Sequence, residues 1–420
     1  MRRRFLELIG VAAVVMAVIV LLKVAPVPVA GPTSLGSFVG VAEAAGEGAQ
    51  APRPAATPGG AATTGPVAKT PWGEPDLQGI WNDVYLTPLQ RSARYAGKEF
   101  FTDAERAALD KQRAAIELRP RQEGGTERDV AGAYNAVFMS IRPTGRRTSL
   151  IVDPPDGRIP PMTPELQKRI AQEREYRLAL LQSTVACKNQ DPSCRGGKYG
   201  PPSPRRAETP PRYSTGNINR VENPEDRSMS ERCMSALLPD FTGYRRIVQS
   251  PGSVAIFYDV GQGQGWQRTI PVNGSSHLPS QVRQFFGDSR GRWEGNTLVV
   301  DVTNFSAKSD FQGSRENLHL IERWTRTGPN TLEYVVTMDD PTTWTKPWTV
   351  KQEYTRQNEQ LNRIYYEPRC HEGNYGTVAL LAGGRAGEKA FAEGRGPHPA
   401  TIDNATGMQA PDENVDPLTR

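Results

Sequence analysis

The sequence is short of the residues that build protein cores and of those that carry much enzyme chemistry. Hydrophobic residues make up 37% of its 420 positions, and it has only four histidines and four cysteines. The mean hydropathy is −0.56. In contrast, 40 glycines and 36 prolines exceed average usage. A chain of this composition cannot form a hydrophobic core along its whole length. It is expected to contain a large share of loops, turns and linkers.

The chain also lacks a strong surplus of one charge. Its 51 Lys and Arg residues against 46 Asp and Glu residues give a net charge of +5. Nucleic-acid-binding domains concentrate much more positive charge on one face, so we predict no nucleic-acid partner. The basic residues between 195 and 220 lie among prolines. They are interpreted as a solvated, extended loop, with a contact to anionic lipid or another polyanion as the alternative.

Metal-binding motifs are absent from the sequence. His371-Glu372 lacks the second histidine of the H-E-x-x-H motif. His319 and Glu322 are three apart on a predicted strand, which places them on opposite faces. We therefore predict no metal site and no cofactor.

A short pattern at 287–291 resembles a nucleophile elbow. Gly287-Asp288-Ser289-Arg290-Gly291 fits G-x-S-x-G, but an elbow needs a strand, a sharp turn at the serine and then a helix. Here the sequence pattern predicts that residues 292–294 and 298–302 form the two strands of a hairpin, and no helical pattern follows. Ser289 is therefore not expected to be a nucleophile.

The N-terminus has the features of an export signal. Arg2-Arg3-Arg4 precedes a nearly continuous apolar run from Phe5 to Leu22, and Ala42-Glu43-Ala44 offers a cleavage site. We predict that residues 1–44 form a signal peptide or, since the apolar run is long, an uncleaved signal anchor. The protein is then periplasmic or secreted, with a tether to the inner membrane only if the segment is retained.

The four cysteines are Cys187, Cys194, Cys233 and Cys370. An exported chain favours disulfides over metal thiolates, and three pairings are possible. Cys187 with Cys194 would close a short loop, and Cys233 with Cys370 would join the start of the β-rich region to its end.

The pattern along the chain predicts four further regions. Residues 45–70 form a disordered linker, 71–230 a helical and irregular arm packed on the β domain, 231–385 an antiparallel β domain, and 386–420 a disordered tail. In the arm, Thr102 with Glu105 predicts a helix start. Thr163 before Pro164 predicts another that runs to about Leu181.

From Tyr244 onward, apolar residues recur with a period of two, and short turns separate the runs. This pattern predicts an antiparallel meander that forms a barrel or a sandwich, so the class is mainly β and α+β overall. One face carries large side chains: Leu318, Leu320 and Trp324, then Leu332, Tyr334, Val336 and Met338, then Trp348, Val350 and Tyr354, then Ile364 and Tyr366.

Two sets of residues are candidates for a functional site. Aromatic residues on the predicted strands and polar residues near the last strand are candidates for ligand binding: Trp293, Trp324, Tyr334, Trp348, Asn374 and Tyr375. The catalytic candidates are Asp288, Arg290, His277, His371 and Glu372. Asp288 with Arg290, and Asp301 with Arg292, are also interpreted as ion pairs that fix loops or neighbouring strands.

Several stretches resemble a family of exported bacterial hypothetical proteins. They are "PDLQGIW" (75–81), "RRTSLIVDPPDGRIPP" (146–161), "ERC" (231–233), "GDSRGRWEGNTLVVDVTNF" (287–305), "ERWTR" (322–326), "DDPTTWTKPWT" (339–349) and "CHEGNYG" (370–376). The resemblance implies that 287–296 belongs to a recurring β unit and that Cys233 and Cys370 sit in family motifs, but it implies no catalytic roles. Gly79-Ile80-Trp81 ahead of a strand meander is weakly similar to lipocalin-like barrels.

The sequence favours an exported cell-envelope protein that binds a small, partly apolar ligand in an aromatic-lined barrel or groove. The alternative is a hydrolase, lyase or isomerase that acts on such a ligand, and the third option is an envelope scaffold without a pocket. Catalysis, the ligand and the oligomeric state stay open at this point.

Overall fold

The computed structural model describes residues 68–117, 142–213, 218–227, 229, 232, 237–261, 264–357 and 375–404. All belong to one compact unit, residues 61–420. The predicted export segment and most of the linker lie outside the described residues. So do several residues named above: Cys233, Ile364, Tyr366, Cys370, His371, Glu372 and Asn374.

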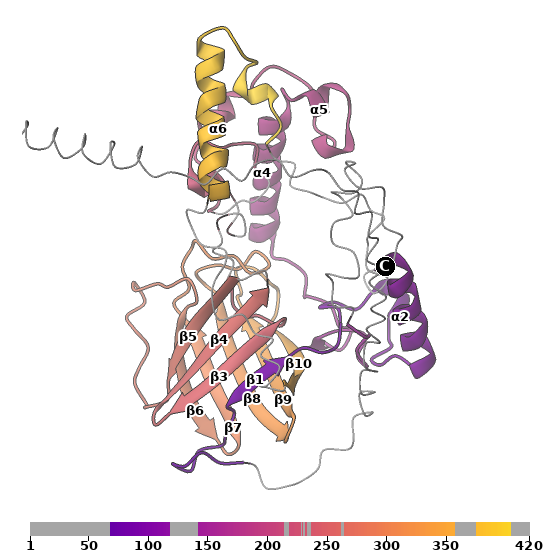
Figure 1. Ribbon diagram of the computed structural model, residues 1–420, viewed down its shortest axis with the longest axis vertical. Helices are drawn as coiled ribbons and strands as arrows, with labels where there is room; N and C mark the ends of the chain where they lie inside the picture. Colours follow the sequence, from indigo (N-terminus) through magenta and orange to yellow (C-terminus); the bar gives the residue numbers. More distant parts are fainter. Residues whose placement is uncertain are drawn as a thin grey trace, which may run out of the picture. The chain divides into compact units, whose positions relative to one another are not determined.

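The fold is a nearly closed antiparallel barrel (Figure 1). Its nine strands follow the order β5-β4-β3-β1-β10-β9-β8-β7-β6, and β2 pairs with the start of β10. This confirms the predicted mainly-β class and decides for the barrel over the sandwich. The strands are β1 (Gly79–Asn82), β2 (Ile151–Asp153), β3 (Tyr244–Ser250), β4 (Ser253–Gly261), β5 (Gln264–Pro271), β6 (Asp288–Glu294), β7 (Thr297–Thr303), β8 (His319–Gly328), β9 (Thr331–Asp339) and β10 (Trp348–Arg356).

The barrel closes along a seam between β5 and β6. Every neighbouring pair in the strand order is antiparallel, and an odd number of strands then forces the first and last to run parallel. Side chains fit this geometry, because Arg268 meets Ser289 and a Cβ on Gly291 would lie 3.0 Å from Ile270. Among the described residues no backbone ladder joins β5 to β6.

Large side chains fill the barrel, as the period-two pattern predicts. The inward residues of β8, β9 and β10 are almost all buried, and Trp324, Tyr334 and Trp348 are at most 1% exposed. β1 contributes Trp81, which is fully buried. The arm therefore supplies one strand of the barrel, between β3 and β10, rather than only packing against it.

Both predicted helix starts in the arm are confirmed. At the start of α2, the backbone N–H groups of Thr102 and Glu105 each donate to the other residue's side chain. At the start of α4, the Thr163 hydroxyl accepts from the Leu166 N–H. Cys187 and Cys194 form a disulfide, with Cα atoms 4.9 Å apart. The helices are α2 (Asp103–Glu117), α4 (Pro164–Leu181), α5 (Val185–Lys188) and α6 (Tyr375–Ala392), with 3-10 turns η1 (Ala93–Tyr95), η2 (Pro192–Cys194), η3 (Pro204–Ala207), η4 (Pro224–Asp226) and η6 (Pro399–Thr401).

The C-terminal part differs from the sequence expectation. Residues 375–404 form α6 and η6, where the composition predicts the end of the β domain and then a disordered tail. One contribution is helix propensity: five of the 18 residues of 375–392 are Ala and two are Leu, which favour helix, although four are Gly. Within the described part of the chain, no helix combines the length and apolar character needed to cross a membrane.

Candidate functional site

The pentapeptide 287–291 is part of a hairpin, as predicted. β6 and β7 pair from Asp288–Thr303 to Glu294–Thr297. Gly287 has a φ of +65°, and a Cβ there would lie 2.6 Å from the Thr303 carbonyl oxygen. Ser289 lies within a strand, is 5% exposed and points into the barrel toward Arg268. The local geometry thus accounts for the glycine and for the serine without an elbow.

A buried ion pair occupies the barrel interior. Arg268 Nη2 lies 2.7 Å from Glu322 Oε2, and the two side chains are 3% and 0% exposed. The Tyr334 hydroxyl donates to Glu322 Oε1 at 2.7 Å, and Arg268 donates to the Tyr258 hydroxyl at 3.0 Å. Burial raises the pKa of Tyr258 and Tyr334, so both hydroxyls stay protonated. Sequence reasoning missed this network, since none of its members is close to another in sequence.

A second arginine lies nearby in the same interior. Arg245 is fully buried, with its guanidinium carbon 3.9 Å from the Tyr354 ring centroid and 5.5 Å from that of Tyr258. Its Nη2 donates to the Thr242 carbonyl at 2.9 Å. Trp324 stacks on Tyr334 at 4.0 Å. The barrel thus encloses its own aromatic and charged side chains.

The predicted ligand-binding aromatic residues are part of that packing. Trp324, Tyr334 and Trp348 lie inside the barrel, and Trp293 is half-buried against it. Tyr375 begins α6. A role for these residues in ligand binding stays a prediction.

Three of the predicted catalytic candidates meet on the outer face of the barrel. His277 Nδ1 lies 2.8 Å from Asp288 Oδ2. Asp288 also accepts from the Leu278 N–H at 2.9 Å and from Arg290 Nη1 at 2.6 Å. Asp288 is only 4% exposed, whereas His277 is 29% exposed. The ion pair between Asp288 and Arg290 is therefore present as predicted.

The other predicted ion pair is different. Arg292 pairs with Glu294, not with Asp301. The register places Arg290 opposite Asp301 and puts Arg292 opposite Val299, two residues further along. Asp301 instead lies next to two imidazoles. Its Oδ1 is 3.0 Å from His319 Nε2 and 3.3 Å from His277 Nε2.

In this outer cluster, the His277 ring is not positioned as a free base. Both ring nitrogens of His277 lie beside carboxylate oxygens. A general base needs a free ring nitrogen within reach of the substrate proton, and here both nitrogens are engaged. In the part of the chain that the structure describes, no group of three or more His, Cys, Asp or Glu residues is arranged to hold a metal ion.

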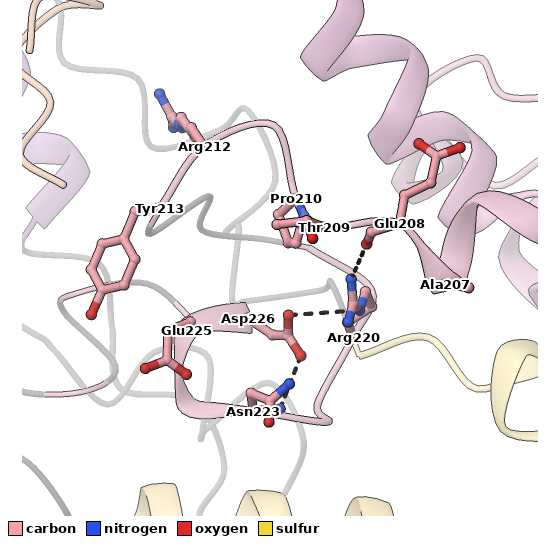
Figure 2. Close-up of a pocket in the computed structure, with 10 residues that line it drawn as sticks. All are labelled: Ala207, Glu208, Thr209, Pro210, Arg212, Tyr213, Arg220, Asn223, Glu225 and Asp226. Atoms are coloured by element: carbon pink, nitrogen blue, oxygen red, sulfur yellow. Dashed lines mark hydrogen bonds and ion pairs between the residues drawn. The ribbon is translucent and has the colours of Figure 1, made fainter. Parts of the chain in front are cut away.

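A cavity of about 440 Å³ lies in the arm, outside the barrel wall (Figure 2). Its lining includes Ala207, Pro210 and Tyr213 together with polar residues such as Arg220 and Asp226. This volume falls within the range of about 300–1,000 Å³ that is usual for small-molecule sites.

Arg220 is the centre of the polar side. It donates to the Tyr176 hydroxyl at 2.9 Å, to the Glu208 carbonyl at 2.7 Å and to Glu222 Oε2 at 2.6 Å. Its Nε also lies 3.6 Å from Asp226 Oδ1 (Figure 2). The guanidinium is thus held in one position, with α4, the 207–213 loop and η4 all bonded to it.

Asp226 caps the N-terminus of the turn η4, of which it is the last residue. Its Oδ2 accepts from the backbone N–H groups of Glu222 and Asn223, at 3.1 and 3.0 Å. Burial raises the pKa of this carboxyl. Asn223-Pro-Glu-Asp fits a capping box, which is the one sequence signal that could have drawn attention to this segment.

Comparison with known proteins adds little. No protein-family model matches the sequence, and no curated protein matches it. Among solved structures, a mutant of the fluorescent protein UnaG is 16% identical, covers 28% of this chain and 72% of that one, and has a TM-score of 0.18. For wild-type UnaG the values are 16%, 27%, 72% and 0.17. TM-scores this low carry no argument, so the assignment of the barrel fold rests on the strand pairing of this chain alone.

Proposed function

We propose that this chain is an exported envelope protein that binds a small, partly apolar ligand, and that the ligand lies in the cavity bordered by residues 207–213 and 220–226. The single observation that carries the proposal is the cavity itself: about 440 Å³, lined by Ala207, Pro210 and Tyr213 together with the buried Arg220. Binding sites commonly combine a mostly apolar lining with a few fixed polar groups.

The polar groups are pre-positioned for this role. Arg220 and Asp226 are 9% and 2% exposed, and backbone or side-chain partners fix both. Fixed partners lower the conformational entropy that a ligand must otherwise overcome on binding. The barrel supplies the rigid support, because Arg212 at the cavity pairs with Asp310 in the loop that follows β7, at 3.2 Å.

The proposal is tested by native mass spectrometry on the chain produced in a bacterial periplasm. The expected result is a reproducible excess of small-molecule mass on the native protein that disappears on denaturation. Ala207→Trp would fill the cavity and should remove the excess. Ala382→Trp makes the same change on α6, at an exposed position that does not border the cavity.

The outcomes separate clearly. Loss of the excess mass in Ala207→Trp with retention in Ala382→Trp supports the cavity as the site. A bare polypeptide mass for the wild type contradicts the proposal, and equal retention in both variants places the ligand elsewhere. The denatured mass also reports whether residues 1–44 remain.

A further inference from the structure

Residues 182–200, which follow the end of α4 (Figure 1), form a closed segment that we call the disulfide loop. The Gly200 N–H donates to the Gln182 carbonyl at 2.9 Å and closes the base of the loop. The disulfide between Cys187 and Cys194 lies inside it, and both cysteines are buried. Further backbone hydrogen bonds join residues within the loop. The loop is therefore held in one shape and presents its remaining side chains outward.

The positive charge of the chain is concentrated around this loop. Residues 174–206 contain seven Lys and Arg residues and two acidic residues, a net charge of +5 that equals the net charge of the whole chain. Within the loop, Lys188, Arg195 and Lys198 are exposed. Among the described residues no ion pair involves any of the three. Such a surface attracts an anionic partner.

The excess of positive charge extends to the last turns of α4. Burial lowers the pKa of Arg177 there, and the nearby guanidinium groups of Arg212 and Arg195 lower it further, while Glu173 raises it. The cations of the loop and of its surroundings therefore repel one another, and an anionic partner would relieve this repulsion.

The disulfide loop also carries the two most exposed of the larger apolar side chains in the part of the chain that the structure describes. Val185 is 59% exposed and Tyr199 is 56% exposed. Val185 lies on α5 three residues before Lys188, so the two share one face of that turn, away from the buried Cys187. Apolar side chains and free cations thus lie together on one small, fixed surface.

From this combination we propose that the disulfide loop docks on the surface of an anionic phospholipid bilayer. Lys188, Arg195 and Lys198 bind the lipid phosphates, and Val185 and Tyr199 enter the layer between the head groups and the acyl chains. Cations that bind anionic head groups, together with apolar and aromatic side chains at the level of the head groups, are the usual means of peripheral membrane binding. The proposal is independent of the cavity and its ligand, and this contact is separate from the predicted N-terminal tether.

A bilayer accounts for the loop better than a soluble polyanion does. The phosphate or sulfate groups of a polyanion would explain the exposed cations, but they leave no role for Val185 and the ring of Tyr199. A bilayer has both an anionic surface and an apolar layer beneath it. The charge and the apolar side chains are thus explained by one partner.

Hydroxyl-radical footprinting of Tyr199 tests the proposal on the full-length protein. Oxidation of Tyr199, relative to that of the partly exposed Trp72 before β1, is measured with two kinds of vesicle: phosphatidylcholine alone, and phosphatidylcholine with phosphatidylglycerol in equal amounts. We expect the ratio to fall at least about threefold on the anionic vesicles. It should recover in about 1 M NaCl, where the Debye length is about 3 Å. The readout reports on the loop whether or not residues 1–44 hold the protein on the vesicle.

Lys188→Glu combined with Lys198→Glu should remove the protection of Tyr199, because each cation near an anionic surface contributes about fivefold to membrane affinity. Lys111→Glu combined with Lys346→Glu is the matched control. It changes the net charge by the same amount at two exposed lysines outside 174–206, one on α2 and one in the loop before β10. The control should keep the wild-type protection.

The apolar part of the contact is tested by Val185→Ser, which should lower the protection of Tyr199 from about threefold to about twofold. Val248→Ser makes the same change at an exposed valine on β3 and should have no effect. Equal behaviour of these two variants would show that Val185 does not enter the bilayer.

Equal oxidation ratios on the two kinds of vesicle would overturn the proposal. So would protection that persists in Lys188→Glu with Lys198→Glu, or that is lost equally in the charge-matched control, since the response would then follow net charge alone. Protection by dextran sulfate that anionic vesicles do not produce would assign the loop to a soluble polyanion and overturn docking on a bilayer.

Discussion

The barrel wall carries an ion-pair network on each of its faces, and the two differ in what they can do. Inside, Arg268 and Glu322 are at most 3% exposed, and each forms a hydrogen bond with a buried tyrosine. Outside, His277 and Asp301 are about a third exposed. Strand β8 contributes Glu322 to the inner network and His319 to the outer one. The same strand thus contributes to one ion pair that is closed to solvent and to another that solvent reaches.

The difference teaches that burial, rather than distance, decides the role of an ion pair. The closest contacts in the two networks are alike, at 2.7 Å inside and 2.6 Å outside. In the interior, removal of one partner leaves a charge that water cannot reach. On the outer face, water replaces a lost partner, and the energies are small. We therefore expect the inner network to contribute more to stability than the outer one does.

The largest expected effect comes from breaking the inner pair. Glu322→Gln keeps the shape of the side chain but leaves Arg268 without a counter-charge, and it should lower the free energy of unfolding by about 3–5 kcal/mol. Asp301→Asn on the outer face is the matched change and should lower it by less than about 1 kcal/mol. Urea denaturation at pH 7 measures both, and equal losses would remove the distinction between the two faces.

A second prediction concerns Asp83, which follows β1 and is 3% exposed. Its carboxylate pairs with Arg142 and accepts from the Gly243 N–H. Burial nevertheless raises the pKa of Asp83 to about 6, from an ordinary value of 3.8. Since one pKa unit corresponds to about 1.4 kcal/mol, ionised Asp83 destabilises the folded state by about 3 kcal/mol at neutral pH.

The sign of the pH dependence follows from proton binding. Between pH 4 and 6 the folded state binds more protons at Asp83 than the unfolded state does, so stability falls as pH rises and is constant above that range. From pH 7 to 5, the wild type should gain about 1.3 kcal/mol relative to Asp83→Asn. Parallel urea titrations at the two pH values measure the difference. A constant gap would show that Asp83 ionises normally in the folded protein.

The sequence predicted the wall of the barrel well and its contents less well. Alternation along 318–324 and 332–338 defined which residues face inward, and the three-residue spacing of His319 and Glu322 placed them on opposite faces. It could not pair Arg268 with Glu322, because they are 54 positions apart and their approach depends on barrel closure. The order of the strands, with β1 inserted between β3 and β10, has no local signal either.

The candidate sites show the same limit. Asp288 and Arg290 pair as predicted, since both lie on one face of β6, two residues apart. Asp301 was assigned to the wrong partner, since its contacts come from β8 and from the 272–287 connection. The cavity near Arg220 is lined by residues from 207–213 and 220–226, which have no regular periodicity, so neither a strand nor a helix pattern could indicate it.

The smallest expected effect is that of Ser289→Ala, which tests whether the inner network depends on every polar contact. Arg268 Nη1 reaches Ser289 Oγ only at 3.4 Å, while its other bonds to Glu322 and Tyr258 are 2.7 and 3.0 Å. A bond this long is weak, so the change should lower the free energy of unfolding by about 0.5 kcal/mol. Gly291→Ala on the same strand, where a Cβ would meet Val272 and Ile270 at 2.9 and 3.0 Å, should be the more damaging of the two. If Ser289→Ala proved as harmful as Glu322→Gln, the network would depend on the serine, and the account of an interior held by its charges would be wrong.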